Sequence, residues 1–231
     1  TDKVVAINVE ARSYRTSKFE PPEVLGPIDL GVKLHMDYYE SWKYDVFHKN
    51  NVVIMGKGLF TGGKLVGTHR LIAVFRSPIT KTLHVSALGG AAYKFMRSGV
   101  DAVVIEGLAK EPTIIFIEGD ESGKTKVSFD TINLNVLESV FQEYKGRKGT
   151  YALTQYIIDK YWDFVNTNKA RAVVVGPAAL HTINGALFSI DIDLRRKTLA
   201  LGSEDSASRG GGGSVLYRAH KIVAIVFGGK F

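Results

Sequence analysis

The sequence has no cysteine, only 3 methionines and 6 prolines among 231 residues, and no long uninterrupted apolar run. Without cysteine, the chain has no disulfide, no thiol nucleophile and no thiolate ligand for zinc or for an iron–sulfur cluster. Without a run of about 18 apolar residues, we expect no membrane-spanning helix. The first residues show no signal-peptide pattern, so we expect a cytoplasmic protein. Low cysteine and methionine contents also fit a thermophile.

The charge balance favours cations, with 30 Lys and Arg against 23 Asp and Glu and a net charge of +7. Such an excess points to an anionic partner. The basic residues form no run of five or more, and the sequence contains neither a recognition-helix pattern nor an RNA-binding aromatic motif. Nucleic acid is therefore not the expected partner, and a solvated basic surface is the plain alternative to an anion site.

Glycine is abundant, and several of the 24 glycines occur in groups. These groups are Gly56 and Gly58, Gly62 and Gly63, Gly89 and Gly90, and Gly210 to Gly213. Arg70, Arg76 and Arg209 lie close to them in the sequence. Glycine lets the backbone approach a ligand and its N–H groups hold phosphate, while arginine adds bidentate charge. The pattern indicates a phosphate-bearing small molecule. These loops carry neither a P-loop nor a GxGxxG motif, which disfavours nucleoside triphosphates and Rossmann-type dinucleotides.

The hydrophobic pattern predicts a chain rich in short strands. Strands are expected at residues 3–11, 52–55, 70–75, 102–105, 113–118, 124–129, 171–175, 186–190, 197–201 and 222–227. Helices are expected at residues 91–97, 134–144 and 151–164, with Thr150 as N-cap of the last and Gly146 closing the second. Residues 23–49 read as irregular and aromatic-rich. A packed loop or an inter-domain contact is the simpler interpretation of Tyr38 to Phe47, and a base-stacking platform is the alternative.

An internal repeat joins the two glycine-rich regions. Residues 86–107 align without a gap to residues 208–229, at a constant offset of 122 positions. Upstream, Val53–Gly56 resembles Val173–Gly176. We therefore predict two related halves, at about 50–107 and 172–229, packed with pseudo-two-fold symmetry. The two glycine-rich loops would then lie on equivalent sites, and such a surface suits a ligand with two similar anionic halves. A duplication with one working site, or chance similarity between β-rich segments, are the alternatives.

Five segments in order resemble one protein family. They are residues 67–78, 89–95, 99–113, 175–179 and 209–216. Together they resemble the N-terminal domain of the tungsten-containing aldehyde:ferredoxin oxidoreductases. Within that family, residues 151–156 and 202–205 are most similar to the glyceraldehyde-3-phosphate:ferredoxin oxidoreductase branch. The resemblance runs from about Asn50 to the end of the chain and is less clear over residues 12–49.

The resemblance implies an α+β fold with two related β-rich halves and a few short helices, forming one cofactor-cradling domain over residues 1–231. In the family, this domain supports a bis-pterin tungsten cofactor, with a magnesium ion linking the two pterin phosphates; the choice between tungsten and molybdenum stays open. Later helical domains carry the cysteines of an iron–sulfur cluster. Because this chain has none, we expect a fragment, or a subunit that needs those helical domains or a partner subunit.

Several residues match the family's cofactor-binding positions. Arg70 matches an arginine that contacts the pterin and the cluster edge, although Thr68 and His69 precede it instead of two glycines. Ala87 and Ser206 match the two main-chain carbonyl donors to magnesium. The position of a phosphate-contacting arginine holds Asp205, whose carboxylate either does not make that contact or makes it through magnesium. Arg209 is then the best remaining phosphate partner. The full expected cofactor-binding set is Arg70, Ala87, Gly89, Gly90, Ser206, Ser208, Arg209 and Gly210.

The resemblance implies oxidation of an aldehyde to an acid, with electrons passed to ferredoxin, and a phosphorylated aldehyde suits the basic surface. No catalytic residue is expected in this chain, which should not be active alone, and a second copy of the chain stays open as a partner. The alternative function is a non-catalytic binding or scaffold module that kept the fold without the cofactor. The six histidines show no metal-ligand spacing, and Asp191 with Asp193 reads more simply as a solvated strand face than as a cation site.

Overall fold

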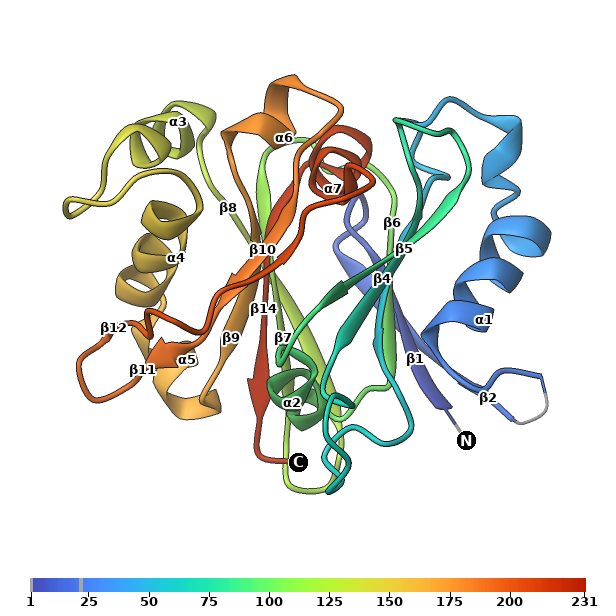
Figure 1. Ribbon diagram of the computed structural model, residues 1–231, viewed down its shortest axis with the longest axis horizontal. Helices are drawn as coiled ribbons and strands as arrows, with labels where there is room; N and C mark the ends of the chain where they lie inside the picture. The colour runs from blue at the N-terminus through green and yellow to red at the C-terminus, as the bar shows by residue number, and fades with distance from the viewer. Residues whose placement is uncertain (1, 21–22) are drawn as a thin grey trace.

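The computed structural model describes residues 2–20 and 23–231 and contains two six-stranded sheets (Figure 1). The first, sheet A, consists of β1 (Asp2–Asn8), β2 (Ser13–Phe19), β3 (Val53–Lys57), β4 (Leu71–Arg76), β5 (Leu83–Leu88) and β6 (Ala102–Glu106). The second, sheet B, consists of β7 (Thr113–Gly119), β8 (Thr125–Thr131), β9 (Arg171–Val175), β10 (Leu187–Ile190), β13 (Asp205–Ala207) and β14 (Ile222–Gly229). A two-stranded ribbon, β11 (Ile192–Asp193) with β12 (Thr198–Leu199), completes the strands of the described residues.

The two sheets share one topology. Sheet A has the order β2-β1-β6-β3-β4-β5, and sheet B, read from its β8 edge, has the order β8-β7-β14-β9-β10-β13. In sheet A, β1 pairs in parallel with β6, and in sheet B, β7 pairs in parallel with β14. Every other pairing in the two sheets is antiparallel. The matched strands begin at Asp2 and at Thr113, well before the repeats that the sequence pattern delimits. The predicted α+β fold with two related β-rich halves is confirmed.

The ladder register refines the sequence alignment. Val53 pairs with Ile105 in sheet A, and Arg171 pairs with Phe227 in sheet B. Because Ile105 and Phe227 are matched in the repeat, Val53 corresponds to Arg171. The alignment of Val53–Gly56 with Val173–Gly176 was therefore wrong by two residues. A shift of two keeps every side chain on the same face of its strand, which is why apolar alternation alone did not reveal it.

Helices cover the outer faces of both sheets and fill the space between them. Their bounds are α1 (Pro27–Lys33), α2 (Ala92–Phe95), α3 (Leu134–Gln142), α4 (Gly149–Lys160), α5 (Trp162–Asn168), α6 (Pro177–His181) and α7 (Gly212–His220). In Figure 1, α3, α4 and α5 flank sheet B on one side, and α1 flanks sheet A on the other. Both α2 and α7 contact strands of each sheet and lie between them. None of the helices in the described part of the chain has the length and apolarity that crossing a bilayer requires.

The main core lies between the two sheets. It includes Val5 and Val103 of sheet A, Val173 and Ile225 of sheet B, and Phe95 of α2, all fully or almost fully buried. A second, smaller core on the outer face of sheet A packs Val4, Ile54 and Val74 against Leu30 of α1. The larger of these two cores joins both sheets with α2 and α7, and the geometry of the glycine-rich loops rests on it.

Most of the expected elements are present, but four local expectations were wrong. Residues 27–43 are largely helical: α1 leads into a π-helix at Leu34–Tyr38 and a short 3₁₀-helix at Ser41–Lys43. The helix after residue 149 begins at Gly149 with Lys148 as N-cap, not Thr150, and it breaks at Tyr161. Gly146 lies in the turn after α3 and does not close that helix. Strands β5 and β13, which the pattern did not predict, position the candidate site.

Candidate functional site

The two sheets meet along their edge strands β5 and β13, which pack against each other. An ideal Cβ on Gly89, just after β5, would lie 2.7 Å from Oδ1 of Asp205, the first residue of β13. An ideal Cβ on Gly210, after the end of β13, would lie 2.4 Å from the ring of His84, near the start of β5. The end of each strand therefore lies beside the start of the other, so β5 and β13 run in opposite directions across the pseudo-two-fold axis.

This arrangement brings both glycine-rich loops to the same edge of the molecule. The close approach explains why small residues stand there. Gly90 has a φ of +69° and Gly210 a φ of +84°, values that side chains rarely allow, and at Gly89 the Asp205 carboxylate occupies the space of a side chain. The carbonyl of Gly210 also accepts a 2.8 Å hydrogen bond from Ser77 Oγ, so this loop is tied to the first half. The glycines let the two halves of the protein touch.

Ala87 and Ser206 occupy equivalent register positions on the paired edge strands. Ala87 pairs with Ile72 and then Gly56, and Ser206 pairs with Phe188 and then Val174. Both lie between the two glycine contacts, next to the pseudo-two-fold axis. Ser206 is exposed, and its Oγ lies 2.7 Å from Oγ of Ser208. An edge strand has one row of peptide groups without a ladder partner, so both strands can present carbonyl oxygens here.

Arg70 and Arg209 are both exposed, and neither guanidinium makes a hydrogen bond or ion pair with any residue that the structure describes. Arg70 precedes β4, whose Leu71 pairs with Leu88, so it lies beside the Gly89 loop. Arg209 follows β13 directly, beside Gly210. Because β5 and β13 are antiparallel, the two arginines stand at opposite ends of the paired strands, one with each loop. The two loops therefore lie along one edge, one at each end of the paired strands, and the structure does not bring the two arginines together.

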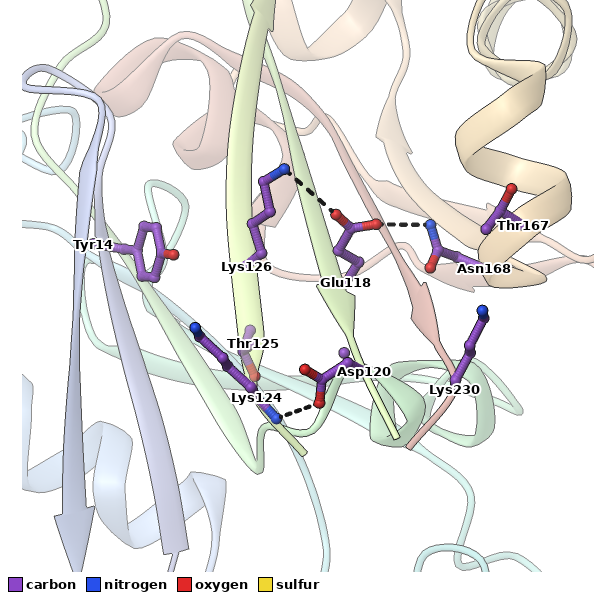
Figure 2. A pocket seen from close by; sticks show the side chains of 10 residues that line it. Tyr14, Glu118, Asp120, Lys124, Thr125, Lys126, Thr167, Asn168 and Lys230 are labelled. Atoms are coloured by element: carbon purple, nitrogen blue, oxygen red, sulfur yellow. Dashed lines mark hydrogen bonds and ion pairs between the residues drawn. The ribbon is translucent and has the colours of Figure 1, made fainter. Parts of the chain in front are cut away.

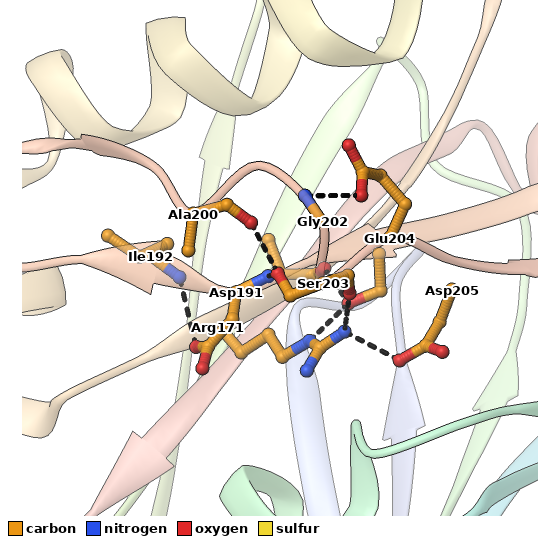
Figure 3. A network of polar contacts seen from close by, with 10 residues as sticks. Arg171, Asp191, Ile192, Ala200, Gly202, Ser203, Glu204 and Asp205 are labelled. Atoms are coloured by element: carbon orange, nitrogen blue, oxygen red, sulfur yellow. Dashed lines mark hydrogen bonds and ion pairs between the residues drawn. The ribbon is translucent and has the colours of Figure 1, made fainter.

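Asp205 has a partner that the sequence did not reveal. Arg171 of β9, with only 5% of its side chain exposed, donates from Nη2 to Oδ2 of Asp205 at 2.7 Å and from Nε to Ser189 Oγ at 2.8 Å. Figure 3 shows the same guanidinium reaching the Ser203 carbonyl, at 3.2 Å. The carboxylate is thus neutralised from beneath the loop. It does not face an incoming anion unpaired, which removes the electrostatic objection raised by an acidic residue at this position.

Other residues singled out from the sequence have structural partners. Asp191 Oδ1 accepts the Ile192 N–H at 2.9 Å, and Asp193 Oδ1 accepts the Arg195 and Arg196 N–H groups in the β11–β12 turn. Within the described residues, no cluster of three acidic, histidine or cysteine side chains could hold a metal ion. Asp193 therefore organises the β11–β12 turn, and Asp191 holds the N–H at the start of β11.

Part of the aromatic segment and the histidine beside Arg70 have packing partners, whereas Tyr38, Trp42 and Tyr44 of the segment are 65%, 55% and 40% exposed. The Phe47 ring lies under the Arg218 guanidinium at 3.8 Å, and the Tyr39 hydroxyl donates to Glu106. His69 Nδ1 accepts the Gly62 N–H at 3.1 Å, and its ring contacts Tyr93 edge-on. Tyr39 and Phe47 thus fit a packed segment, and the role of the exposed aromatic side chains stays a prediction.

Two further features near the loops were not expected from the sequence. Leu59, Phe60 and Val66 project from the loop before Arg70 with 64%, 64% and 102% of their surface exposed. Lys94 of α2 follows the Gly89–Gly90 turn, and burial lowers the pKa of its amine against the opposing effect of Asp191. The exposed loop could have been noticed in the sequence, because it is apolar, rich in glycine and free of acidic residues. The lowered pKa of Lys94 could not, because it depends on packing.

A separate open hollow of about 560 Å³ lies at the opposite side of the sheets, near Tyr14, Lys126 and Lys230. Figure 2 shows Glu118 between Lys126 and Asn168, with contacts of 3.9 and 3.0 Å. Glu118 is thus already paired, and none of the expected site residues line the hollow. This hollow therefore does not belong to the twin-loop surface.

Comparison with solved structures defines the class of domain first. The chain aligns with the active-site complex BamBC of benzoyl coenzyme A reductase with a TM-score of 0.74, over 99% of this chain and 30% of that chain. At 21% identity this likeness concerns the fold. The chain is thus an α+β domain of two related six-stranded sheets, of a kind found as part of a longer polypeptide.

The family follows from the sequence comparisons. The family described as "Aldehyde ferredoxin oxidoreductase, N-terminal domain" matches residues 4–229, so the chain belongs to this family. It is 48% identical over 190 residues to glyceraldehyde-3-phosphate:ferredoxin oxidoreductase of Pyrococcus furiosus, covering 82% of this chain and 29% of that protein. It is 40% identical over 215 residues to an uncharacterised protein of Methanocaldococcus jannaschii, covering 93% of this chain and 31% of that protein. The chain spans about three tenths of the length of these relatives.

Proposed function

We propose that this chain is the part of a ferredoxin-linked aldehyde oxidoreductase that carries a bis-pterin tungsten or molybdenum cofactor. Glyceraldehyde-3-phosphate is the aldehyde that the 48% identical relative suggests. The observation that carries the proposal is the antiparallel packing of β5 and β13, which places two glycine-rich loops, each with its own unpaired arginine, at one edge. A ligand with two phosphate-bearing halves matches that arrangement.

The residues present fit such a group. Arg70 and Arg209 supply charge for one anionic half each, and the Ser206 and Ser208 hydroxyls supply hydrogen bonds. Main-chain carbonyl oxygens, such as those we assign to Ala87 and Ser206, are hard donors of the kind that magnesium prefers. Gly89, Gly90 and Gly210 allow the loops to come close enough to form one surface.

When bound, the cofactor's metal supplies the two-electron oxidation of the aldehyde to the acid. This chain's own residues bind and orient the cofactor from one side, and we assign no catalytic residue to it. We propose that the helical part of the longer enzyme, or a partner subunit, completes the pocket and carries the iron–sulfur cluster and the ferredoxin contact. The alternative of a scaffold module is less well supported, because the acidic departure at Asp205 is neutralised by Arg171.

The test is the cofactor content of the complete, anaerobically purified enzyme that contains this chain. Arg209→Ala should lower the tungsten or molybdenum and the pterin per protein at least threefold, with stability changed by less than about 0.5 kcal/mol because the residue is exposed. Metal analysis and pterin fluorescence after oxidation measure the content. Arg195→Ala, an exposed arginine of the β11–β12 turn in the same half, is the matched control. Unchanged cofactor content in Arg209→Ala would remove this residue from the site.

A further inference from the structure

The outer face of sheet A has a groove at a place that is covered in sheet B. The groove, a hollow of about 280 Å³, has Val4, Ala6 and Val104 among its lining residues, with Phe19 and Tyr39 at its sides. Helix α1 contacts β3 and β4 of this sheet, so the groove lies over the other strands, β1, β2 and β6. An apolar hollow on an otherwise packed sheet face is a feature that requires an explanation.

The equivalent position in sheet B shows what can fill such a groove. Ala6 pairs with Val104, and Phe116 pairs with Val226, so Ala6 and Phe116 occupy the same place in the shared topology. The Phe116 ring contacts Tyr161 at 4.7 Å and Phe164 at 5.1 Å between ring centres, and these two residues come from the α4–α5 junction and from α5. In sheet B, therefore, helix-borne aromatic side chains cover this face.

The two sheets also correspond in the polar side chains beside this position. In sheet B the Tyr161 hydroxyl donates to Oδ2 of Asp130 at 2.6 Å. Asp130 pairs with Ile114, and Ser17 pairs with Val4, so Ser17 stands in the groove where Asp130 stands in sheet B. An incoming phenol hydroxyl would find a hydroxyl partner at the equivalent point.

The charge and size of the groove select the same kind of occupant. The two basic residues at its rim are already paired: Arg15 with Glu106, and Lys33 with Glu23 at 3.1 Å. Asp37 also lines the groove and makes no ion pair with a described residue, so the rim disfavours an anionic occupant. At about 280 Å³ the hollow is also slightly smaller than the usual ligand pocket, about 300–1,000 Å³, and matches a few side chains.

We propose that this groove docks an α-helix from outside the domain, which inserts a tyrosine and a second aromatic side chain about one turn apart. The relatives offer a source for such a helix, since about seven tenths of their length lies outside the region that this chain matches. The helix would complete on sheet A the cover that α5 provides on sheet B. This inference does not depend on the cofactor or on the reaction.

The test uses a peptide of residues 149–168, which carries both Tyr161 and Phe164, as the probe. In ¹³C-methyl NMR spectra of the chain, the methyl groups of Val4, Ala6 and Val104 should shift saturably as this peptide is added. A peptide with alanine at both aromatic positions should bind at least tenfold more weakly. Absence of shifts at these methyl groups at millimolar wild-type peptide would overturn the proposal, and so would equal binding of the two peptides.

Two variants of the chain locate the binding. Ser17→Trp covers the groove from the exposed strand β2 and should weaken binding of the wild-type peptide at least tenfold. Thr16→Trp, the neighbour on the opposite face of the same strand, is the matched control and should leave binding within twofold. Ala6→Phe, which copies Phe116, is a second blocking variant. Equal binding by Ser17→Trp and Thr16→Trp contradicts the proposal, as does a dimer of the chain in sedimentation that only Ser17→Trp dissociates, since a second copy would then be the occupant.

Discussion

The two halves of this protein share one strand order but differ in what covers and supports it. Sheet B has a full outer layer of helices α3, α4 and α5, whereas sheet A has α1 and leaves a groove at Ala6. Below the edge strands, sheet B has the ion pair of Arg171 and Asp205, and the equivalent positions of sheet A hold Val53 and Ser86. Backbone hydrogen bonds define the shared topology, so side chains on its faces could diverge without changing the strand order.

The largest expected change in stability concerns the helices that cover the outer face of sheet B. Phe116→Ala removes a ring that is 5% exposed and packs against Tyr161 and Phe164. We expect it to lower the free energy of unfolding by about 4 kcal/mol, since the helices above cannot collapse fully into the cavity. Urea unfolding measures the change, and Val85→Ala on exposed β5 is the control, with a change under about 0.5 kcal/mol. A loss below about 1 kcal/mol for Phe116→Ala would mean that the helical layer of sheet B contributes no more than the open face of sheet A.

The two glycine-rich loops offer the next comparison. An ideal Cβ on Gly213, in the second half, would lie 2.1 Å from the backbone oxygen of Ala186, whereas on Gly89, in the first half, it would meet a carboxylate side chain at 2.7 Å. Because backbone moves less easily than a side chain, we expect Gly213→Ala to cost about 3 kcal/mol and Gly89→Ala about 1 kcal/mol.

Denaturant unfolding of both loop variants tests this order. Gly58→Ala is the control, because an added Cβ there meets nothing within 4 Å, and its effect should stay within about 0.5 kcal/mol. Equal losses of unfolding free energy for Gly213→Ala and Gly89→Ala would show that the two loops are equally constrained and would contradict this prediction.

Breaking the buried ion pair of Arg171 and Asp205 should lower stability by a smaller amount, and a double variant should restore most of it. Asp205→Asn leaves Arg171 almost fully buried without its carboxylate, and we expect a loss of about 2 kcal/mol. The double variant Arg171→Val with Asp205→Ser copies the first half and should recover most of that loss, because an apolar replacement removes the unpaired charge. Ser86→Ala, at the position equivalent to Asp205, should change stability by less than about 0.5 kcal/mol. A double variant less stable than Asp205→Asn would contradict this account.

Much of the fold could be predicted from apolar pattern alone. The buried strands β6, β9 and β14 are short runs of branched aliphatic residues, and the β7–β8 hairpin is marked by a glycine- and aspartate-rich turn. Helix α1 was not predicted, because its sequence contains Gly31 and begins at Pro27 directly after Gly26. In the structure Gly31 is required by packing, since an added Cβ would lie 2.6 Å from the Val74 side chain. Intrinsic propensity opposes the helix there, and tertiary contact decides.

The candidate site was predictable only in part. Gly89, Gly90 and Gly210 were identified by grouping and by the repeat, and all three have close contacts or positive φ values that explain them. Arg171 was not identified, because in the sequence it is one arginine at the start of a strand. Its role depends on a partner 34 residues away that reaches it only once β9, β10 and β13 are paired. The assignment of Arg70, Ala87, Ser206, Ser208 and Arg209 to a cofactor stays a prediction.

The sequence by itself determined the strand-rich pattern, the duplicated order of its elements and the absence of any thiol chemistry. These properties are local or compositional, so they can be read from neighbouring residues. Only the tertiary structure decided that β5 and β13 run side by side in opposite directions, that Arg171 neutralises Asp205, and that a groove stays open over β1. Each of these depends on contacts between segments distant in the sequence: the packing of the two sheets, the pairing of β9, β10 and β13, and the placement of α1 over sheet A.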